Sequence, residues 1–536
     1  MEREGQTVDV LVVGAGASGA AFSWSLAESG ISVLCLEQGD WVQSHSYSST
    51  HDDWELHRQT DMNPNPNVRR DRQDYPVDET DSDISPLMYN AVGGSTIHWS
   101  AHVPRFHPSD FRVRTLDGVA DDWPIKYEDL EEFYDLNDQM IGVAGVVGDP
   151  AYPLKSDRQT GPVPLGKLGL KMVEGFERLG WHWWPSESAV VTEAYDGRLP
   201  CNNCGPCDIG CTRGSKASSD ITYWPKALEA GAKLETGVTV SEITLDEDGL
   251  ANGVLYYSRD GSVHRQRADF VILAANGIGT TRLLLNSKST LFPDGLANRS
   301  GLVGNNLMFH PYTRITGVFD EALDGHKGPI SCCFISHEFY ETDPSRDFFR
   351  GYSLQVVRGS GPAQSALGGL ASNMVPWGLN HHRVFRERYN HEITLAISGE
   401  DLPEKENRVE LDTLLTDKFG IPAPKVIYRL SDNSKKLMNH AISKGAEVLK
   451  AAGAKYVLTH PLLRASGWHL LGTARMGSSP ETSVVNQWGQ SHDVKNLFII
   501  DGSIFVTSAA IAPTSTIQAL ALRIADYFKR NIKRIS

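Results

Sequence analysis

A glycine-rich turn near the N-terminus has the residue types and spacing to bind a phosphate group. The pattern G-x-G-x-x-G is formed by Gly14, Gly16 and Gly19. Such glycines allow a tight turn, the close approach of a pyrophosphate and a helix packed against its strand. An apolar β-branched run precedes them, a helical run follows, and the next apolar run ends at Glu37, a carboxylate suited to a ribose hydroxyl. These features predict a dinucleotide site without separating FAD from NAD.

A histidine in the C-terminal part of the chain is the candidate acid–base residue. His469 opens a segment that ends at Gly477. An imidazole can take a hydroxyl proton because its ordinary pKa lies near working pH. Further on, an apolar run ends in Asp501-Gly502, and residues 512–518 lead into a helix whose N-terminus would stabilise an anion. Taken alone, His469 fits a buried structural histidine better than a catalytic one.

Four cysteines stand within eleven residues, at Cys201, Cys204, Cys207 and Cys211. Their spacing is similar to that of a bacterial ferredoxin run, with Thr212 in place of the usual proline. Thiolates this close could hold an iron–sulfur centre or zinc, and the alternative is metal-free thiols or disulfides. The neighbours Cys332 and Cys333 indicate buried strand residues rather than a site.

Length and charge limit the classes of protein to consider. A chain of 536 residues has room for two or three domains, and a net charge of −15 argues against a nucleic-acid partner. No apolar run reaches the length of a membrane span, and the first residues lack the pattern of a signal peptide. We therefore expect a cytoplasmic protein. The alternative is a periplasmic protein carried across the membrane by a signal-bearing partner subunit.

The elements that must position these residues follow from the hydrophobic pattern. We expect strands near residues 8–13, 233–245, 252–258 and 270–275, and helices near 17–29, 120–145, 167–179, 280 and 434–452. Residues 40–87 are polar and predict a long loop or lid, and residues 312–430 predict a mainly β region. Because the first and last hundred residues both have an α/β pattern, they predict one nucleotide-binding domain built from distant segments.

Four motifs resemble those of the GMC (glucose–methanol–choline) family of FAD-dependent oxidoreductases. They are the glycine fingerprint with Glu37, the run at residues 91–99, the segment at residues 304–311 and the block from His469 to Gln518. They occur in the family's order and span nearly the whole chain. Within the family, the chain looks closest to bacterial sugar and polyol dehydrogenases, such as the large subunits of gluconate, fructose and glucose dehydrogenases.

The resemblance implies an α/β fold with two domains. A Rossmann-like FAD-binding domain would be assembled from discontinuous segments, and an α+β substrate-binding domain would contain a large antiparallel sheet. The expected FAD-binding domain comprises residues 1–110, 200–311 and 456–536, and the expected substrate-binding domain comprises residues 111–199 and 312–455.

The resemblance also implies a reaction and its residues. A sugar, sugar acid or polyol gives a hydride from a CH–OH group to flavin N5, and His469 removes the hydroxyl proton. The residues implied to bind FAD are Gly14, Gly16, Ser18, Gly19, Glu37, Gly93, Gly94, Ser95, His98, Val238, Ala275, Asp501, Gly502 and Thr514.

The resemblance further implies a route for the electrons. They would pass to an external acceptor, with a small subunit and a cytochrome as partners. In glucose and fructose dehydrogenases a cysteine cluster in this region holds a [3Fe–4S] centre, and its spacing differs from that of Cys201, Cys204, Cys207 and Cys211.

Two positions leave alternatives open. Ala512 stands where the family usually has Asn or His beside the catalytic histidine, so Ser508, Thr507 or His310 would have to substitute, or the protein is slow or inactive on ordinary alcohols. His98 matches the residue that anchors FAD covalently in pyranose oxidases, and the alternative role is packing near the flavin ring. The rival functions are a pyranose-oxidase-like oxidase and a non-catalytic or electron-transfer flavoprotein.

Overall fold

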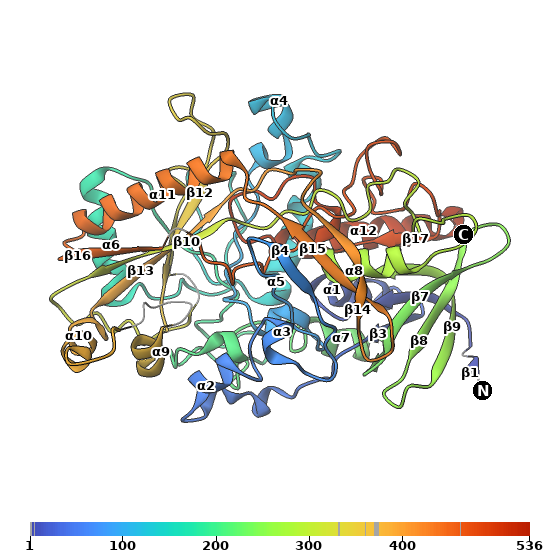
Figure 1. The fold of residues 1–536 in the computed structure, drawn as a ribbon, viewed down its shortest axis with the longest axis horizontal. Helices are drawn as coiled ribbons and strands as arrows, with labels where there is room; N and C mark the ends of the chain where they lie inside the picture. The colour runs from blue at the N-terminus through green and yellow to red at the C-terminus, as the bar shows by residue number, and fades with distance from the viewer. Residues whose placement is uncertain are drawn as a thin grey trace.

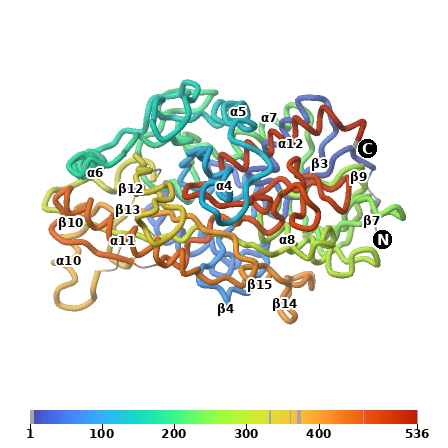
Figure 2. The backbone as a smooth tube through the Cα atoms, turned by 90° about the horizontal axis from the view of Figure 1, so that it is seen from above, coloured from blue at the N-terminus to red at the C-terminus, as the bar shows by residue number. Residues whose placement is uncertain are grey.

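The computed structural model describes residues 3–4, 6–330, 333–359, 361–368, 375–460 and 462–535. Two large sheets lie toward opposite ends of the long axis, and both chain termini lie at the same end (Figure 1, Figure 2). The first sheet is mostly parallel and the second is antiparallel. The expected α/β fold with a second, antiparallel sheet is therefore confirmed.

The first sheet is formed by apolar runs from both ends of the chain and the middle. Its parallel strands are β2 (Val8–Val13), β3 (Val33–Glu37), β6 (Lys233–Thr236), β9 (Val263–Leu273) and β17 (Leu497–Ile499), and the short β1 (Arg3–Glu4) also pairs with β9. β7 (Thr239–Leu245) and β8 (Ala251–Tyr257) extend it antiparallel to β9. The strand predicted near 233–245 is thus two strands on opposite edges, separated by a left-handed turn at Gly237 (φ +72°).

Five helices pack around this sheet. They are α1 (Ala17–Ala27), α5 (Glu131–Ile141), α7 (Tyr223–Glu229), α8 (Asn276–Asn286) and α12 (Thr514–Ile535). α12 lies against both α1 and α5. The helix predicted near residue 280 begins at Asn276, because the Asn276 carboxamide accepts hydrogen bonds from the backbone N–H groups of Ile278 and Gly279. Of the helix predicted over 120–145, only α5 is α-helical.

The second sheet has the strand order β16-β10-β13-β12-β11-β5. Its strands are β5 (Trp184–Pro185), β10 (Tyr312–Val318), β11 (Phe334–Ser336), β12 (Tyr352–Val357), β13 (Glu392–Gly399) and β16 (Tyr456–His460). The amphipathic helices α6 (Gly166–Leu179) and α11 (Asp432–Ala451) share an apolar core with it, which includes Phe176, Leu395 and Leu437.

Two segments lie elsewhere than the expected domain boundaries put them. β16 pairs with β10 in the second sheet, although residues 456–536 were expected in the FAD-binding domain. Phe111 and Tyr134 belong to the core of the first sheet, although residues 111–199 were expected in the substrate-binding domain. The expected ranges came from the family resemblance, which does not show which core a short apolar run joins.

A small third sheet joins the two halves. β4 (Asp78–Ser82) pairs with β15 (Pro422–Tyr428), which pairs with β14 (Arg408–Thr416). The predicted loop at 40–87 also contains the short helices α2 (Trp54–Gln59) and α3 (Pro66–Arg69). The remaining helices are α4 (Val113–Asp117), α9 (Pro362–Leu367) and α10 (His381–Arg388). In the described part of the chain, no helix combines the length and apolarity needed to cross a membrane.

Candidate active site

A cavity of about 640 Å³ lies between the carboxyl ends of β2 and β3 and the residues of β10, β12 and β13 that face them. Its lining includes His469 and most of the predicted cofactor residues, namely Gly14, Gly16, Ser18, Glu37, Gly94, Ser95, His98, Val238, Ala275, Asp501, Gly502 and Thr514. Gly19 and Gly93 stand behind this wall. One cavity therefore brings together residues from the first hundred, the middle and the last seventy positions of the chain.

The three glycines of the fingerprint have different roles in packing. A Cβ at Gly14 would lie 2.6 Å from the carbonyl oxygen of Ala274, and one at Gly19 would lie 2.0 Å from that of Gly14. A Cβ at Gly16 would have no protein atom within 4 Å, and Gly16 lines the cavity. Gly14 and Gly19 therefore serve the approach of helix and strand, and Gly16 leaves room for a ligand.

The helix behind this turn offers free donors to that ligand. α1 begins after Gly16 without a side-chain cap and has no acidic residue in its first turn, so its first N–H groups and positive dipole end face the cavity. Glu37 Oε2 accepts from Ala15 N at 2.7 Å and Oε1 accepts from Gly39 N at 2.8 Å. These contacts hold the carboxylate at the cavity wall. An anion-binding helix end beside a fixed carboxylate fits the pyrophosphate and ribose of a dinucleotide.

The segment that contains His98 lies against the glycine turn. Gly93 N donates to Ala15 O at 2.9 Å, and a Cβ at Gly94 would lie 3.0 Å from Gly16 Cα. His98 Nδ1 lies 2.7 Å from Asp208 O, so Nδ1 carries the proton. His98 Nε2 is buried and has no hydrogen-bond partner among the described residues. Burial lowers the pKa of His98 to about 3, which leaves a neutral ring with a lone pair on Nε2.

His469 is paired with a buried histidine. Its Nδ1 lies 2.9 Å from His310 Nδ1, and His310 Nε2 lies 3.1 Å from Ser508 O. A carbonyl oxygen only accepts, so His310 Nε2 carries its proton and His310 Nδ1 carries a lone pair. His469 must then donate from Nδ1, which leaves the lone pair of His469 on Nε2. The pair thus fixes the tautomer that a base at the cavity needs.

The surroundings of His469 keep it neutral. Burial is the main cause that holds the pKa of His469 well below its usual value, and the neighbouring His310 and His102 add to this effect. Burial also lowers the pKa of His310 to about 4. A histidine that must accept a proton is useful only in its neutral form. This geometry can therefore remove a proton from a hydroxyl placed at His469 Nε2.

The polar residues near Ala512 do not replace its missing side chain. Thr507 Oγ1 accepts from Trp123 Nε1 at 2.7 Å and donates to Asp110 O at 2.9 Å. Ser508 Oγ accepts from Asp401 N and donates to Asp401 O, both at 2.9 Å. His310 uses both ring nitrogens in the contacts given above. Ala512 itself lines the cavity, and these three residues do not supply the polar contact that the family has at this position.

The cysteine loop touches the wall of this cavity. Asp208, between Cys207 and Cys211, lines the cavity and accepts from His98. Cys207 is buried, and its Sγ accepts from Ile330 N at 3.5 Å. Lys216, a buried cation whose charge acts on Cys207 and Cys211, donates to Ile97 O at 2.7 Å. The loop is thus joined to the segment that carries His98.

The sulfur positions bear on the choice among metals. The six described cysteines are unbridged, and no three of the described sulfur atoms lie within 4.8 Å of one another. Zinc holds thiolates at about 2.3 Å, which places tetrahedral sulfurs roughly 3.8 Å apart. In a [3Fe–4S] or [4Fe–4S] cluster each thiolate binds a different iron, so the sulfurs stand farther apart. The spacing therefore fits zinc poorly and is compatible with a cluster or with free thiols. Cys333 is buried, and Cys332 lies outside the described residues.

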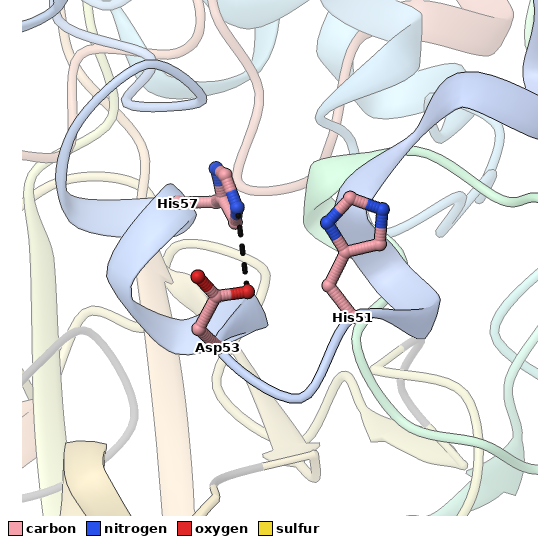
Figure 3. Close-up of side chains that lie close together, drawn as sticks. All are labelled: His51, Asp53 and His57. Carbon is pink, nitrogen blue, oxygen red and sulfur yellow. Dashed lines mark ion pairs between the residues drawn. The ribbon is translucent and has the colours of Figure 1, made fainter.

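A cluster of His51, Asp53 and His57 on the surface at α2 was not singled out from the sequence (Figure 3). Its potential ligand atoms lie within 4.8 Å of one another. His57 Nε2 lies 3.5 Å from Asp53 Oδ1, and Nδ1 lies 2.8 Å from Asp61 Oδ1. The hydrogen bond with Asp61 is the main cause that raises the pKa of His57. An imidazole between two exposed carboxylates, with its pKa raised by them, accounts for this cluster without a metal.

His102 is a cavity residue that the sequence analysis also missed. It lines the cavity and is 3% exposed. Its place four residues after His98 was the only available signal, because a histidine outside a known motif is more often structural.

Comparisons with known proteins identify the family and the fold. Sequence models of the GMC oxidoreductase family match residues 8–312 and 403–521. The 2-methyl-1,2-propanediol dehydrogenase of Mycolicibacterium austroafricanum is 41% identical over 100% of this chain and 97% of the relative. The fructose dehydrogenase large subunit of Gluconobacter japonicus is 28% identical over 100% of both chains. A solved structure of formate oxidase from Aspergillus oryzae RIB40, determined for the effect of a mutation on FAD modification, has the same fold. Its TM-score is 0.64, with 14% identity and 100% of both chains covered.

Proposed function

Because the chain belongs to the GMC oxidoreductase family of FAD-dependent enzymes, we propose that it is a dehydrogenase that oxidises a CH–OH group of a small uncharged alcohol, with a polyol or sugar as the substrate class. The observation that carries this proposal is the His469–His310 pair, whose hydrogen bonds leave a neutral Nε2 on His469 at the cavity. A neutral imidazole in this tautomer can take the hydroxyl proton of the substrate. FAD, when bound, supplies the hydride acceptor.

The lining of the cavity supports an uncharged substrate. Its charged side chains are Glu37, Glu55, Arg58, Asp208, Arg282 and Asp501, which come from the nucleotide sheet, α2, the cysteine loop and α8. The segments around His469 and the facing strands contribute uncharged side chains, among them Tyr312, Gln355, Ser398 and Trp468. A sugar acid would need a cation to balance its carboxylate. The 41% identical relative is named for a small diol, which has the same uncharged character.

The exit of electrons is part of the same proposal. The cysteine loop contacts His98 through Asp208, so a centre held there would lie next to the flavin site. The relative from Gluconobacter japonicus is named as a large subunit, which agrees with a partner subunit that accepts electrons. We propose an iron–sulfur centre bound by Cys201, Cys204, Cys207 and Cys211. Visible spectra before and after acid precipitation test it, because acid destroys the broad absorbance of such a centre and also shows whether flavin stays with the protein at His98.

Anaerobic mixing of the FAD-bearing protein with small diols, polyols and sugars tests the main proposal. We expect loss of the visible flavin absorbance with at least one uncharged substrate. In the matched variant His469→Gln, FAD should remain bound while this loss slows by about 10²- to 10⁴-fold. Rapid peroxide formation in air would show an oxidase instead. Bleaching by dithionite but by no alcohol or sugar would show a non-catalytic or electron-transfer flavoprotein.

A further inference from the structure

Gln355 is a polar residue on the cavity wall that the proposed proton transfer does not use. It lies on β12, and its neighbours Leu354 and Val356 join the apolar core that the second sheet shares with α6 and α11. Successive side chains of a strand alternate between the two faces of a sheet, so Gln355 points away from that core and toward the cavity that it lines. The second sheet therefore presents a carboxamide to the cavity that contains His469.

Two hydrogen bonds in series fix the orientation of this carboxamide. Ser353 Oγ donates its only proton to Ala510 O at 2.8 Å, so at its contact with Gln355, 3.3 Å long, it can only accept. The atom of Gln355 that contacts Ser353 is therefore Nε2. Among the described residues none is bonded to Gln355 Oε1, and this oxygen is not one of the buried polar atoms that lack a partner. Oε1 is thus accessible and free to accept a hydrogen bond from a bound molecule.

Two connections bring this carboxamide to the part of the cavity where the proposed base lies. Ala510, which accepts from Ser353, stands two residues before Ala512, and Ala512 lines the cavity. Trp468, the residue before the base, packs edge-on against Tyr312 at the start of β10, with 5.3 Å between the ring centroids. β10 and β12 lie on either side of β13 in the second sheet. A substrate at the base therefore faces the cavity side of these three strands.

We propose that Gln355 Oε1 accepts a hydrogen bond from a second hydroxyl group of the substrate, one that is not oxidised. This inference rests on the proposed function and narrows its substrate class to alcohols with at least two hydroxyl groups. A hydroxyl group suits this neutral oxygen because it carries a proton to donate, whereas a carboxylate or an ether does not. A monoalcohol would leave Oε1 unpaired in a partly buried site, which weakens its binding.

The test compares the parent substrate with its deoxy analogues in anaerobic flavin bleaching of the FAD-bearing protein. The parent is the diol, polyol or sugar that bleaches the wild type fastest, and each analogue lacks one hydroxyl group that is not oxidised. We expect at least one analogue to react about 10- to 100-fold more slowly with the wild type, in the second-order rate constant. In Gln355→Met, which keeps the length of the side chain but lacks the acceptor, the parent should react as slowly as that analogue, within threefold.

Gln364→Met makes the same chemical change elsewhere on the cavity wall and is the matched control. Gln364 Oε1 already accepts from Arg58, so the preference for the parent over the analogue should stay within threefold of the wild type. Ser353→Ala removes the acceptor for Gln355 Nε2 and lets the carboxamide rotate. It should lower the preference by about three- to tenfold, and it serves if Gln355→Met does not fold.

The outcomes separate the role of Gln355 from the proposed function. If the wild type is bleached but reacts equally well with every deoxy analogue, the role of Gln355 is overturned while the proposed function stands. The same conclusion follows if Gln355→Met, or Ser353→Ala in its place, keeps the preference of the wild type. If no alcohol or sugar bleaches the wild type, the proposed function fails, and the role of Gln355 fails with it.

Discussion

The two ends of the cavity hold their polar groups in different ways. At the nucleotide end, Glu37 has each carboxylate oxygen bonded to a backbone amide, and Asp501 is bonded to Ser503 N and Thr280 Oγ1. At the end that contains His469, both ring nitrogens of His102 lack a hydrogen bond in the part of the chain that the structure describes. The protein itself therefore holds the carboxylates of Glu37 and Asp501 in place, whereas it holds the ring of His102 without hydrogen bonds.

This difference follows from what each end must do. Recognition of a constant cofactor is served by groups fixed in advance, which lowers the entropic cost of binding. The proton transfer that we propose needs a neutral base, and burial keeps His469 neutral by disfavouring its charged form. Burial of unpaired imidazoles costs stability, so such groups concentrate where function requires them.

The largest expected effect lies at the nucleotide end, in Gly19→Ala. A Cβ there would lie 2.0 Å from Gly14 O, and backbone atoms cannot yield to it, so we expect a loss of about 3 kcal/mol or more and no FAD-bearing protein. Gly16→Ala is the matched variant, since its Cβ meets no protein atom. It should leave the melting temperature of the FAD-free protein within about 2 °C but weaken FAD binding at least tenfold. Normal FAD binding by Gly19→Ala would contradict this assignment of the glycines.

The next effect concerns the tautomer of His469. His310→Phe removes the acceptor for His469 Nδ1, so we expect anaerobic flavin bleaching to slow about 10- to 100-fold, as for other histidines that lose an orienting partner. His310→Asn retains an acceptor oxygen and should keep more of the rate. Stopped-flow absorbance measures both variants. Equal losses in the two would indicate that His310 only fills space.

A graded effect is expected from pH. Because the pKa of His469 is held well below its usual value, the bleaching rate should stay level from pH 8 to about pH 6 and fall only in more acid solution. A rate that halves near pH 6.5 would mean that His469 has an ordinary pKa.

Stability should depend on pH through His310. Its pKa is about 4 in the folded protein and about 6.5 in the unfolded chain. Above pH 6.5 both states are neutral, and between pH 6.5 and 4 only the unfolded state takes up the proton. The melting temperature of the wild type, relative to His310→Phe, should therefore fall as the pH drops through this window. A constant difference would contradict burial of a neutral His310.

The smallest effect on substrate oxidation is expected from the cysteine loop. Cys207→Ser should leave anaerobic flavin bleaching within twofold, because Cys207 does not line the cavity. It should slow the transfer of electrons to an external dye or cytochrome. Cys333→Ser is the control, since Cys333 is also buried but lies outside the loop. Slower bleaching in Cys207→Ser would mean that the loop shapes the flavin site itself.

The sequence predicted contiguous features well. The strand–turn–helix unit from Val8 to Glu37 was placed within two residues, because its apolar period and glycines act locally. The family and the two-sheet α/β fold were also predicted and are confirmed. The helix expected near 280 began earlier, since a side-chain cap at Asn276 decides its start. The division of residues 233–245 into two strands was not predicted, because it depends on which neighbouring strand each half pairs with.

The amino-acid sequence by itself determined the nucleotide turn, because its glycines and flanking elements are neighbours whose spacing follows from helix and strand periods. FAD and the histidine proposed as base came from the resemblance of four motifs in their family order. Only the tertiary structure decided which second imidazole holds His469, and that the hydroxyl groups of Thr507 and Ser508 are already bonded elsewhere. These contacts join residues more than 100 positions apart, and no local spacing encodes them.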